Sequence, residues 1–296
     1  MKPAAFGYFR PSSLEEALAQ LAAGGESAKL IAGGQSLGPM LNMRLATPSA
    51  LIDLNDLTEL AYIRDAGATL EIGALTRHDQ IAQSKLVQAQ CPLLAQAAQT
   101  IGHYAIRQRG TIGGSLAHAD PAAQLPLIAT TLAATLAIVR HGGQRVVPSA
   151  DFFQSVMTTA LASDEMIRCV HFPKAAANEG SSFQLFNRRH GDYAIVAAAV
   201  TLALDGEQVA RVRVGLCGVS ATAQTYEKTV RPFVGRQANA AWAAELARAV
   251  RAAVAPQDDP RISALYRQEL TQTLVEQALL RALSRASTTA NDESHG

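Results

Sequence analysis

The sequence predicts an α+β fold, in which two small subdomains of mixed strands and helices precede a C-terminal domain with a three-stranded antiparallel sheet and helices. Two glycine pairs, Gly33-Gly34 and Gly113-Gly114, interrupt apolar stretches in the first half of the chain. Beyond residue 180, alternating strand-like segments give way to alanine-rich helical ones. At 296 residues the chain exceeds one typical domain, so we expect two or three.

Residues 1–55 are predicted to form the first subdomain, a β–α–β unit. A helical pattern begins after Ser12-Ser13, either of which can cap it, and stops at Gly24-Gly25. Strands are predicted over residues 29–31 and 50–54. The first of these strands leads directly into the first glycine pair.

Residues 56–175 are predicted to form the second subdomain, made of hairpins and short helices. We expect Thr76 to cap the first helix and Pro92 to precede the second. The third helix would direct its partial positive charge at the second glycine pair. The predicted strands are 60–64, 69–72, 132–139, 144–147 and 166–172, and the predicted helices are 76–84, 93–101 and 122–130.

Residues 176–285 are predicted to form the C-terminal domain. Its second and third strands join at Asp205-Gly206, a strong hairpin signal. The polar tail, residues 286–296, is predicted to be disordered. The predicted strands are 182–186, 194–204 and 208–217, and the predicted helices are 240–254 and 262–283.

The two glycine pairs are the candidate ligand-binding segments. Glycine lacks a Cβ, so the backbone can approach a ligand closely, and successive N–H groups in a turn can form a nest for phosphate. Gln35 and Ser36 add donors to the first pair. Neither segment has the pattern of a single-loop phosphate binder, such as the P-loop or G-x-G-x-x-G. A dinucleotide held by two loops from separate parts of the chain therefore suits these segments better. Ordinary surface turns remain the alternative.

Three ordered motifs carry a family resemblance: Ala32–Ser36, Thr111–Ser115 and Arg188–Val196. Together they resemble the FAD-binding medium subunit of molybdenum hydroxylases, a family that includes carbon monoxide dehydrogenase and the central domain of xanthine dehydrogenase. The resemblance covers roughly residues 1–285. It implies a two-subdomain FAD-binding fold of the p-cresol methylhydroxylase and vanillyl-alcohol oxidase type, followed by a C-terminal domain like that of carbon monoxide dehydrogenase flavoproteins.

The resemblance also implies a set of cofactor contacts, with Tyr193 shielding one face of the flavin ring. Structural alternatives stay open: Asp120 as a helix cap, Ile101 and Ile167 as core residues, and Tyr193 as a buried strand residue. Gln124 stands where the family often has a carboxylate, and no lysine lies near Gln184-Leu185, which bears on redox tuning. The expected contacts are Leu30, Ile31, Ala32, Gly33, Gly34, Gln35, Ser36, Leu37, Ile101, Thr111, Gly113, Gly114, Ser115, Ala117, Asp120, Gln124, Ile167 and Tyr193.

The function implied by the resemblance is electron transfer, with no catalytic residue of this chain acting on the organic substrate. Electrons would pass from [2Fe–2S] clusters on a small partner subunit through FAD to a terminal acceptor. The substrate would be oxidised at a molybdopterin cofactor on a large partner subunit, in a dimer of heterotrimers. Two alternatives remain: a self-sufficient FAD oxidase or dehydrogenase of the same fold, and an assembly subunit without cofactor.

Composition narrows the classes of function that remain for this chain. A net charge of +1 argues against a nucleic-acid or membrane-surface partner, and no apolar run is long enough for a membrane span. The N-terminus has no signal-peptide pattern. Cys91, Cys169 and Cys217 are far apart and form no metal-binding motif, so we expect no metal ligands in this chain and a reducing, cytoplasmic location.

Overall fold

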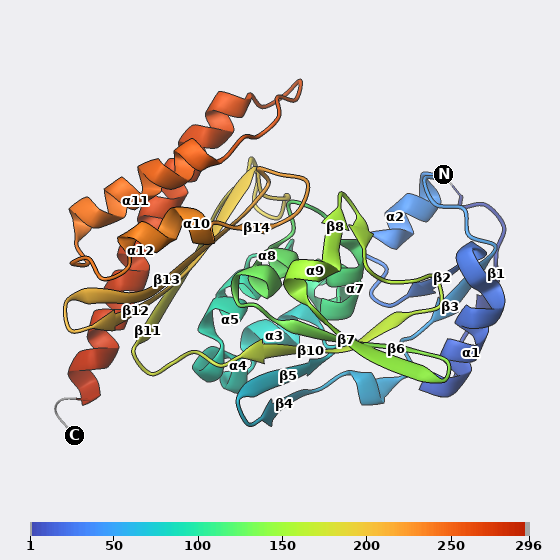
Figure 1. The fold of residues 1–296 in the computed structure, drawn as a ribbon. Coiled ribbons are helices and arrows are strands. Elements are labelled where there is room, and N and C mark those ends of the chain that lie inside the picture. Colours follow the sequence, from blue (N-terminus) through green and yellow to red (C-terminus); the bar gives the residue numbers. More distant parts are fainter. Residues whose placement is uncertain (1, 294–296) are drawn as a thin grey trace.

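Three main sheets, besides a separate two-stranded one, follow one another along the chain in the computed structural model. The structure describes residues 2–293 and the side chains of residues 2–286. The N-terminal and C-terminal sheets lie at opposite ends of the molecule, and a five-stranded sheet lies between them (Figure 1). The α+β fold predicted from the sequence is confirmed to the extent that the structure mixes helices and strands. Within the described part of the chain, none of the helices combines bilayer length with enough apolar character for a membrane span.

The first sheet is parallel, with the order β1-β3-β2, and its strands are β1 (Gly7–Phe9), β2 (Ala28–Ile31) and β3 (Ala50–Asp53). Between β1 and β2 lies α1 (Leu14–Gly24), which begins where Ser13 Oγ accepts from the Glu16 N–H. A 3₁₀ turn (Gly25–Ser27) follows it. The short helix α2 (Leu37–Asn42), which the sequence leaves ambiguous, begins directly after the first glycine segment.

The second sheet is antiparallel, with the order β4-β5-β10-β6-β7. The two predicted hairpins, β4-β5 and β6-β7, form the two edges of this sheet. Strand β10, which follows both hairpins in the sequence, lies between them. A 3₁₀ turn (Thr58–Leu60) leads into the sheet, and β8 (Phe153–Ser155) pairs separately with β9 (Thr158–Thr159). The strands are β4 (Ile63–Ala66), β5 (Thr69–Gly73), β6 (Thr135–Arg140), β7 (Gly143–Pro148) and β10 (Met166–Pro173).

Helices cover one face of this second sheet (Figure 1). The expected cap of the first helix is wrong, because Thr76 Oγ1 donates to the Tyr62 carbonyl at 2.9 Å and the helix begins after Arg77. The helices are α3 (His78–Gln83), α4 (Lys85–Gln90), α5 (Pro92–Gln99), α6 (Tyr104–Arg109), α7 (Ile112–His118), α8 (Gln124–Thr131) and α9 (Ser149–Phe152).

The C-terminal sheet has four strands, not the predicted three, because the two-residue β14 (Gln224–Thr225) pairs with the third strand. Its long strands are β11 (Glu179–Phe186), β12 (Val196–Asp205) and β13 (Gln208–Cys217). The helical elements are α10 (Glu227–Val230), a 3₁₀ turn (Arg231–Phe233), α11 (Ala240–Ala253) and α12 (Ala264–Glu293). Because α12 continues to Glu293, the prediction of a disordered tail from residue 286 is wrong up to that residue, and residues 294–296 lie outside the described part.

Strand β12 is buried on both faces, which explains its continuous run of apolar residues. Ala197 and Ala199 belong to the core shared with the helices of the second sheet. Ala198 and Val200 belong to a second core, which is closed by α11 and α12. The C-terminal sheet is therefore sandwiched between the central helices and its own two helices.

Candidate cofactor site

The first glycine segment, residues 32–36, connects the end of β2 to the start of α2. Gly34 has φ +68°, a left-handed conformation that residues with a side chain rarely adopt. Gly33 is buried, and close packing explains why this position is a glycine. A Cβ on Gly33 would lie 2.2 Å from the carbonyl oxygen of Arg109. The two glycines thus perform separate tasks: Gly34 makes the turn, and Gly33 lets the second glycine segment pack against the first.

This first segment leaves a run of backbone donors free. Among the hydrogen bonds of the described residues, none is donated by the backbone N–H groups of Gly33, Gly34, Gln35, Ser36 or Leu37. The carbonyl groups are engaged, since Gln35 Nε2 donates to the Gly33 carbonyl at 2.8 Å and the Gly38 N–H donates to the Gly34 carbonyl at 2.9 Å. Backbone N–H groups are normally paired, so five successive free donors beside two glycines suit an anionic ligand such as a diphosphate.

The second glycine pair lies in helix α7, so the predicted turn is wrong. Thr111 is the N-cap of that helix, and its Oγ1 accepts from the Gly114 N–H at 3.2 Å. The N–H groups of Ile112 and Gly113 donate to the carbonyls of Thr76 and Ala74 at 3.1 and 2.8 Å. Since the first N–H groups of α7 are already paired, this segment offers no second backbone nest.

Gly113 and Gly114 face different surroundings. A Cβ on Gly113 would lie 2.7 Å from the Cβ of Ala74, so this glycine allows α7 to pack on the end of β5. Gly114 is exposed, and its added Cβ would approach only Thr111 Oγ1, at 2.9 Å. The second pair therefore supplies one close packing contact and one bare stretch of helix surface.

A polar bridge that sequence reasoning missed joins the two segments. The Arg77 guanidinium donates to Asn55 Oδ1 at 2.7 Å and to the Arg109 carbonyl. Asn55 Nδ2 in turn donates to the Ala32 carbonyl at 2.9 Å and to Asp53 Oδ1 at 2.5 Å. Burial lowers the pKa of Arg77 below its ordinary value, and the charge of Arg109 lowers it further. Asn55 lies between two predicted strands and Arg77 lies in the first turn of a predicted helix, where no local pattern marks either residue.

The third motif brings the C-terminal domain to the same place. Gly191 has φ +90°, and a Cβ there would lie 2.8 Å from His103 Nε2, so the loop rests on the segment just before α6. The Tyr193 hydroxyl lies near the Ser36 side chain. Partial burial raises the pKa of Tyr193, and the charge of Asp120 raises it further. Tyr193 is 53% exposed, so the alternative of a buried strand tyrosine is wrong.

Other predicted site residues have structural contacts of their own. Asp120 Oδ1 accepts from the Ala122 N–H at 2.8 Å in a local turn, so the capping alternative is wrong, because α8 begins after Ala123 without a side-chain cap. Gln124 is buried and donates to the Thr100 carbonyl at a long 3.4 Å. Ile167 is buried in the central core, whereas Ile101 packs against that core from its margin. Leu30, Ile31, Leu37 and Ser115 are half-buried, and Ala117 is exposed.

The comparisons with known proteins cover nearly the whole chain. Residues 4–175 match the family model described as the FAD binding domain in molybdopterin dehydrogenase, and residues 181–282 match the carbon monoxide dehydrogenase flavoprotein C-terminal domain. The alpha subunit of the 6-hydroxypseudooxynicotine dehydrogenase complex of Paenarthrobacter nicotinovorans is 40% identical over 296 residues, which are 100% of both chains.

The chain belongs to the FAD-binding medium-subunit family of molybdenum hydroxylases.

Solved structures of this family share the fold. A chain of carbon monoxide dehydrogenase from Hydrogenophaga pseudoflava matches with a TM-score of 0.92 and 36% identity, over 96% of this chain and 99% of that one. A chain of quinoline 2-oxidoreductase from Pseudomonas putida 86 matches with a TM-score of 0.93 and 35% identity, over 97% of this chain and 99% of that one. The medium subunit described here is therefore a flavoprotein subunit of an oxidoreductase, as the sequence motifs predict.

Proposed function

We propose that this medium subunit holds FAD where the first glycine segment, helix α7 and the loop before β12 meet, and that it acts as an electron-transfer subunit. The observation that carries the proposal is the run of five free backbone N–H groups from Gly33 to Leu37. The run includes Ser36, whose side chain lies near Tyr193 of the C-terminal domain.

Each part of the site has a separate task in this proposal. The free N–H groups would hold the diphosphate, because they are donors without a competing acceptor in the protein. The bare surface at Gly114 would let the cofactor lie close to α7. Tyr193, which is half-exposed and lies near Ser36, would cover part of the flavin and limit the access of acceptors. Gly113 and Ile167 would act through packing rather than through direct contact, whereas Gly33 would combine close packing with a free N–H group.

Bound FAD would supply two-electron redox chemistry together with the ability to accept single electrons. In this proposal the electrons come from [2Fe–2S] clusters on a small partner subunit and leave to a terminal acceptor. The organic substrate is oxidised at a molybdopterin cofactor on a large partner subunit. The name of the matching family model, which refers to a molybdopterin dehydrogenase, supports this division of labour. A dimer of such heterotrimers in the reducing cytoplasm is part of the same proposal, supported by three free cysteines.

We also propose domain limits of 1–55, 56–175 and 176–285. The strands of the first sheet fall within residues 7–53, those of the five-stranded sheet within 63–173, and those of the C-terminal sheet within 179–225. The two matched family regions, 4–175 and 181–282, support the second limit.

The proposed electron-transfer function can be tested by recording the flavin absorbance after the protein is mixed with substrate under anaerobic conditions. The purified chain alone should stay oxidised, because no residue of its site is proposed to act on the substrate. Adding the two partner subunits, identified from neighbouring reading frames, should bleach the flavin band within turnover time. Bleaching at the same rate without the partners would overturn the relay assignment in favour of a self-sufficient oxidase. A chain purified without any flavin, and unable to take it up, would favour the assembly subunit.

A further inference from the structure

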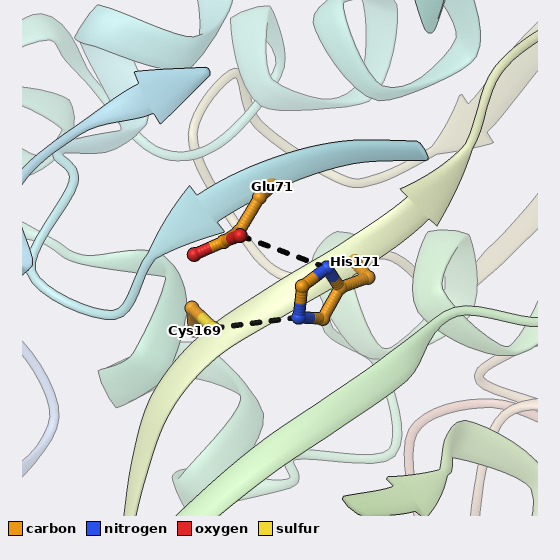
Figure 2. A group of neighbouring side chains, drawn as sticks. All are labelled: Glu71, Cys169 and His171. Atoms are coloured by element: carbon orange, nitrogen blue, oxygen red, sulfur yellow. Dashed lines mark hydrogen bonds and ion pairs between the residues drawn. The ribbon is translucent and has the colours of Figure 1, made fainter. Parts of the chain in front are cut away.

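A second group of reactive side chains lies on the five-stranded sheet. Figure 2 shows Glu71, which comes from β5, beside Cys169 and His171, which come from β10. Glu71 pairs directly with His171 across the two strands, and Cys169 precedes that histidine by two residues on the same strand. Side chains two residues apart on a strand point to the same face, so all three groups meet on one face of the sheet.

This face is the one opposite the central helices. The alternating residues Val170 and Phe172 belong to the central core, which leaves Cys169 and His171 on the other side. Cys169 and Glu71 are 4% and 6% exposed, whereas the His171 side chain is 28% exposed. The group is therefore nearly enclosed, with a route from solvent past the imidazole.

The spacing of the three side chains fits a metal ion. One ligand atom from each residue lies within 4.8 Å of the other two. Cys169 Sγ is 3.6 Å from His171 Nε2, whereas Glu71 Oε2 is 4.0 Å from the other ring nitrogen, Nδ1. An ion beside the sulfur therefore binds Nε2, and the Glu71 carboxylate completes the set by turning toward it. A tetrahedral Zn²⁺ with Zn–S of about 2.3 Å and Zn–N of about 2.0 Å separates the two ligand atoms by roughly 3.5 Å. Without a metal, a hydrogen bond between the sulfur and the imidazole occupies this place.

We propose that Glu71, Cys169 and His171 form a zinc site with three protein ligands and a fourth position open to water. A thiolate, an imidazole and a carboxylate are the ligand types that Zn²⁺ takes in proteins, and the thiolate disfavours Mg²⁺ and Ca²⁺. The ligands stand on two paired strands, which fixes their backbones. Binding replaces the thiol proton: Cys–SH and Zn²⁺ give Cys–S–Zn and one released proton.

The neighbours of Glu71 are compatible with such a site. Tyr62 Oη donates to Oε1, and Arg64 Nη2 lies 2.7 Å from Oε1 and 2.9 Å from Oε2. A carboxylate has about four lone-pair positions, so Oε2, the oxygen nearer His171, keeps one for a metal. Ligating carboxylates are commonly held by outer hydrogen bonds of this kind. The Arg64 cation opposes the metal ion, but Glu71 and the newly formed thiolate of Cys169 carry two negative charges against it.

A metal here would strengthen the support of the cofactor site. Cys169 is the register partner of Gly73, and the next residue, Ala74, accepts from the Gly113 N–H at 2.8 Å. Ala74 also donates to the Arg168 carbonyl at 2.9 Å. A zinc ion that joins β5 to β10 would therefore fix the strand ends on which α7 rests.

The test is calorimetric titration of ZnCl₂ into the flavin-loaded full chain after treatment with a chelator. We expect one high-affinity ion per chain, and an affinity lower by at least about 10-fold in Cys169→Ser and in His171→Asn. The matched controls are Cys91→Ala, a buried cysteine distant in sequence, and His141→Asn, an exposed histidine, both of which should bind as the wild type does.

X-ray absorption at the zinc edge of the loaded wild type gives a readout that needs no variant. One sulfur at about 2.3 Å in the first shell supports the site. A first shell of nitrogen and oxygen only, no saturable binding, or equal binding by wild type and the two ligand variants shows an adventitious ion only and overturns the proposal.

Discussion

At the scale of single residues, the four glycines of the two motifs meet three different physical requirements. Gly34 provides a left-handed backbone angle, Gly33 and Gly113 provide close packing between backbones, and Gly114 leaves a bare surface. The sequence motif looks the same at both places, although the reasons differ. In the proposed site, Gly113 would therefore act through packing alone, whereas Gly33, Gly34 and Gly114 would also contact the ligand.

Alanine at Gly114 and at Gly113 should separate ligand contact from packing. In Gly114→Ala the new methyl group meets only the side chain of Thr111, which can turn away, so the apoprotein should stay folded while its flavin content falls. In Gly113→Ala the new methyl group meets Ala74, which should cost about 1–3 kcal/mol of stability. Flavin absorbance per protein and thermal unfolding of both variants measure the two effects. Stoichiometric flavin in Gly114→Ala would remove α7 from the cofactor site.

His78 is a buried base beneath the second glycine segment. Its Nε2 lies 2.9 Å from the Thr111 carbonyl, which makes Nε2 the donor, and Nδ1 has no hydrogen-bond partner. Burial lowers the pKa of His78 from 6.5 to about 4, only partly opposed by the bond to Thr111. The folded protein therefore keeps this imidazole neutral at a pH where the unfolded chain would protonate it.

Stability should consequently fall as the pH is lowered from about 6.5 towards 4. In that window the unfolded state binds more protons, so the free energy of unfolding rises with pH, with a total contribution of about 3 kcal/mol from this group. The measurement is urea unfolding at several pH values in wild type and in His78→Gln, which retains a donor for Thr111. The wild type should lose more stability across the window, and parallel curves would show that His78 is not responsible.

At the scale of elements, the site depends on how the ends of short segments are tied together. Arg77 lies at the start of α3 and reaches the end of α6, while Asn55 follows β3 and reaches the segment after β2. This chain of hydrogen bonds holds the first glycine segment against the second. We infer that it sets the distance between them.

Arg77→Gln should weaken FAD binding by about tenfold or more, with a loss of stability of about 1–3 kcal/mol, because partly buried acceptors lose their donor. Arg10→Gln is the matched control, since its ion pair with Asp56 is about half exposed and should contribute less than about 1 kcal/mol. Fluorescence titration of the apoproteins with FAD measures the affinity. The bridge has no positioning role if the two variants bind alike.

At the scale of the whole molecule, the domains share their cores. The central cluster includes Phe183, Ala197 and Cys217 of the C-terminal domain together with residues of α5 and α8. Gly215 of β13 lies so close to α8 that a Cβ would lie 1.9 Å from Thr131 Oγ1. The boundary between the two matched family regions is therefore not a boundary between independent folding units.

A fragment of residues 1–175 should fail to fold as a stable monomer, because it exposes the apolar faces of α5 and α8 that the C-terminal sheet covers. It should also lose FAD, since Tyr193 is absent. Size-exclusion chromatography and thermal unfolding followed by circular dichroism are the measurements. A monomeric fragment with a cooperative transition near that of the full chain would show that the shared core is dispensable.

Local sequence signals were enough for most elements and for the family. Strand alternation, the Asp205-Gly206 turn and the Ser13 cap each act within a few residues, and the structure has the corresponding elements. The glycine pairs and the motif before Val196 identify the FAD-binding family. The same local signals predict a turn at Gly113-Gly114, where Thr111 instead caps a helix whose N–H groups are taken up by Thr76 and Ala74.

Only the tertiary structure decided which residues far apart in the chain come into contact. The Arg77–Asn55 bridge, the meeting of Ser36 with Tyr193, and the group of Glu71, Cys169 and His171 all join different elements. Such contacts depend on strand order and on which faces are buried together, because propensity and capping act only between near neighbours. The sequence by itself therefore determined the elements and the cofactor class, and packing determined which backbone groups stay free to bind it.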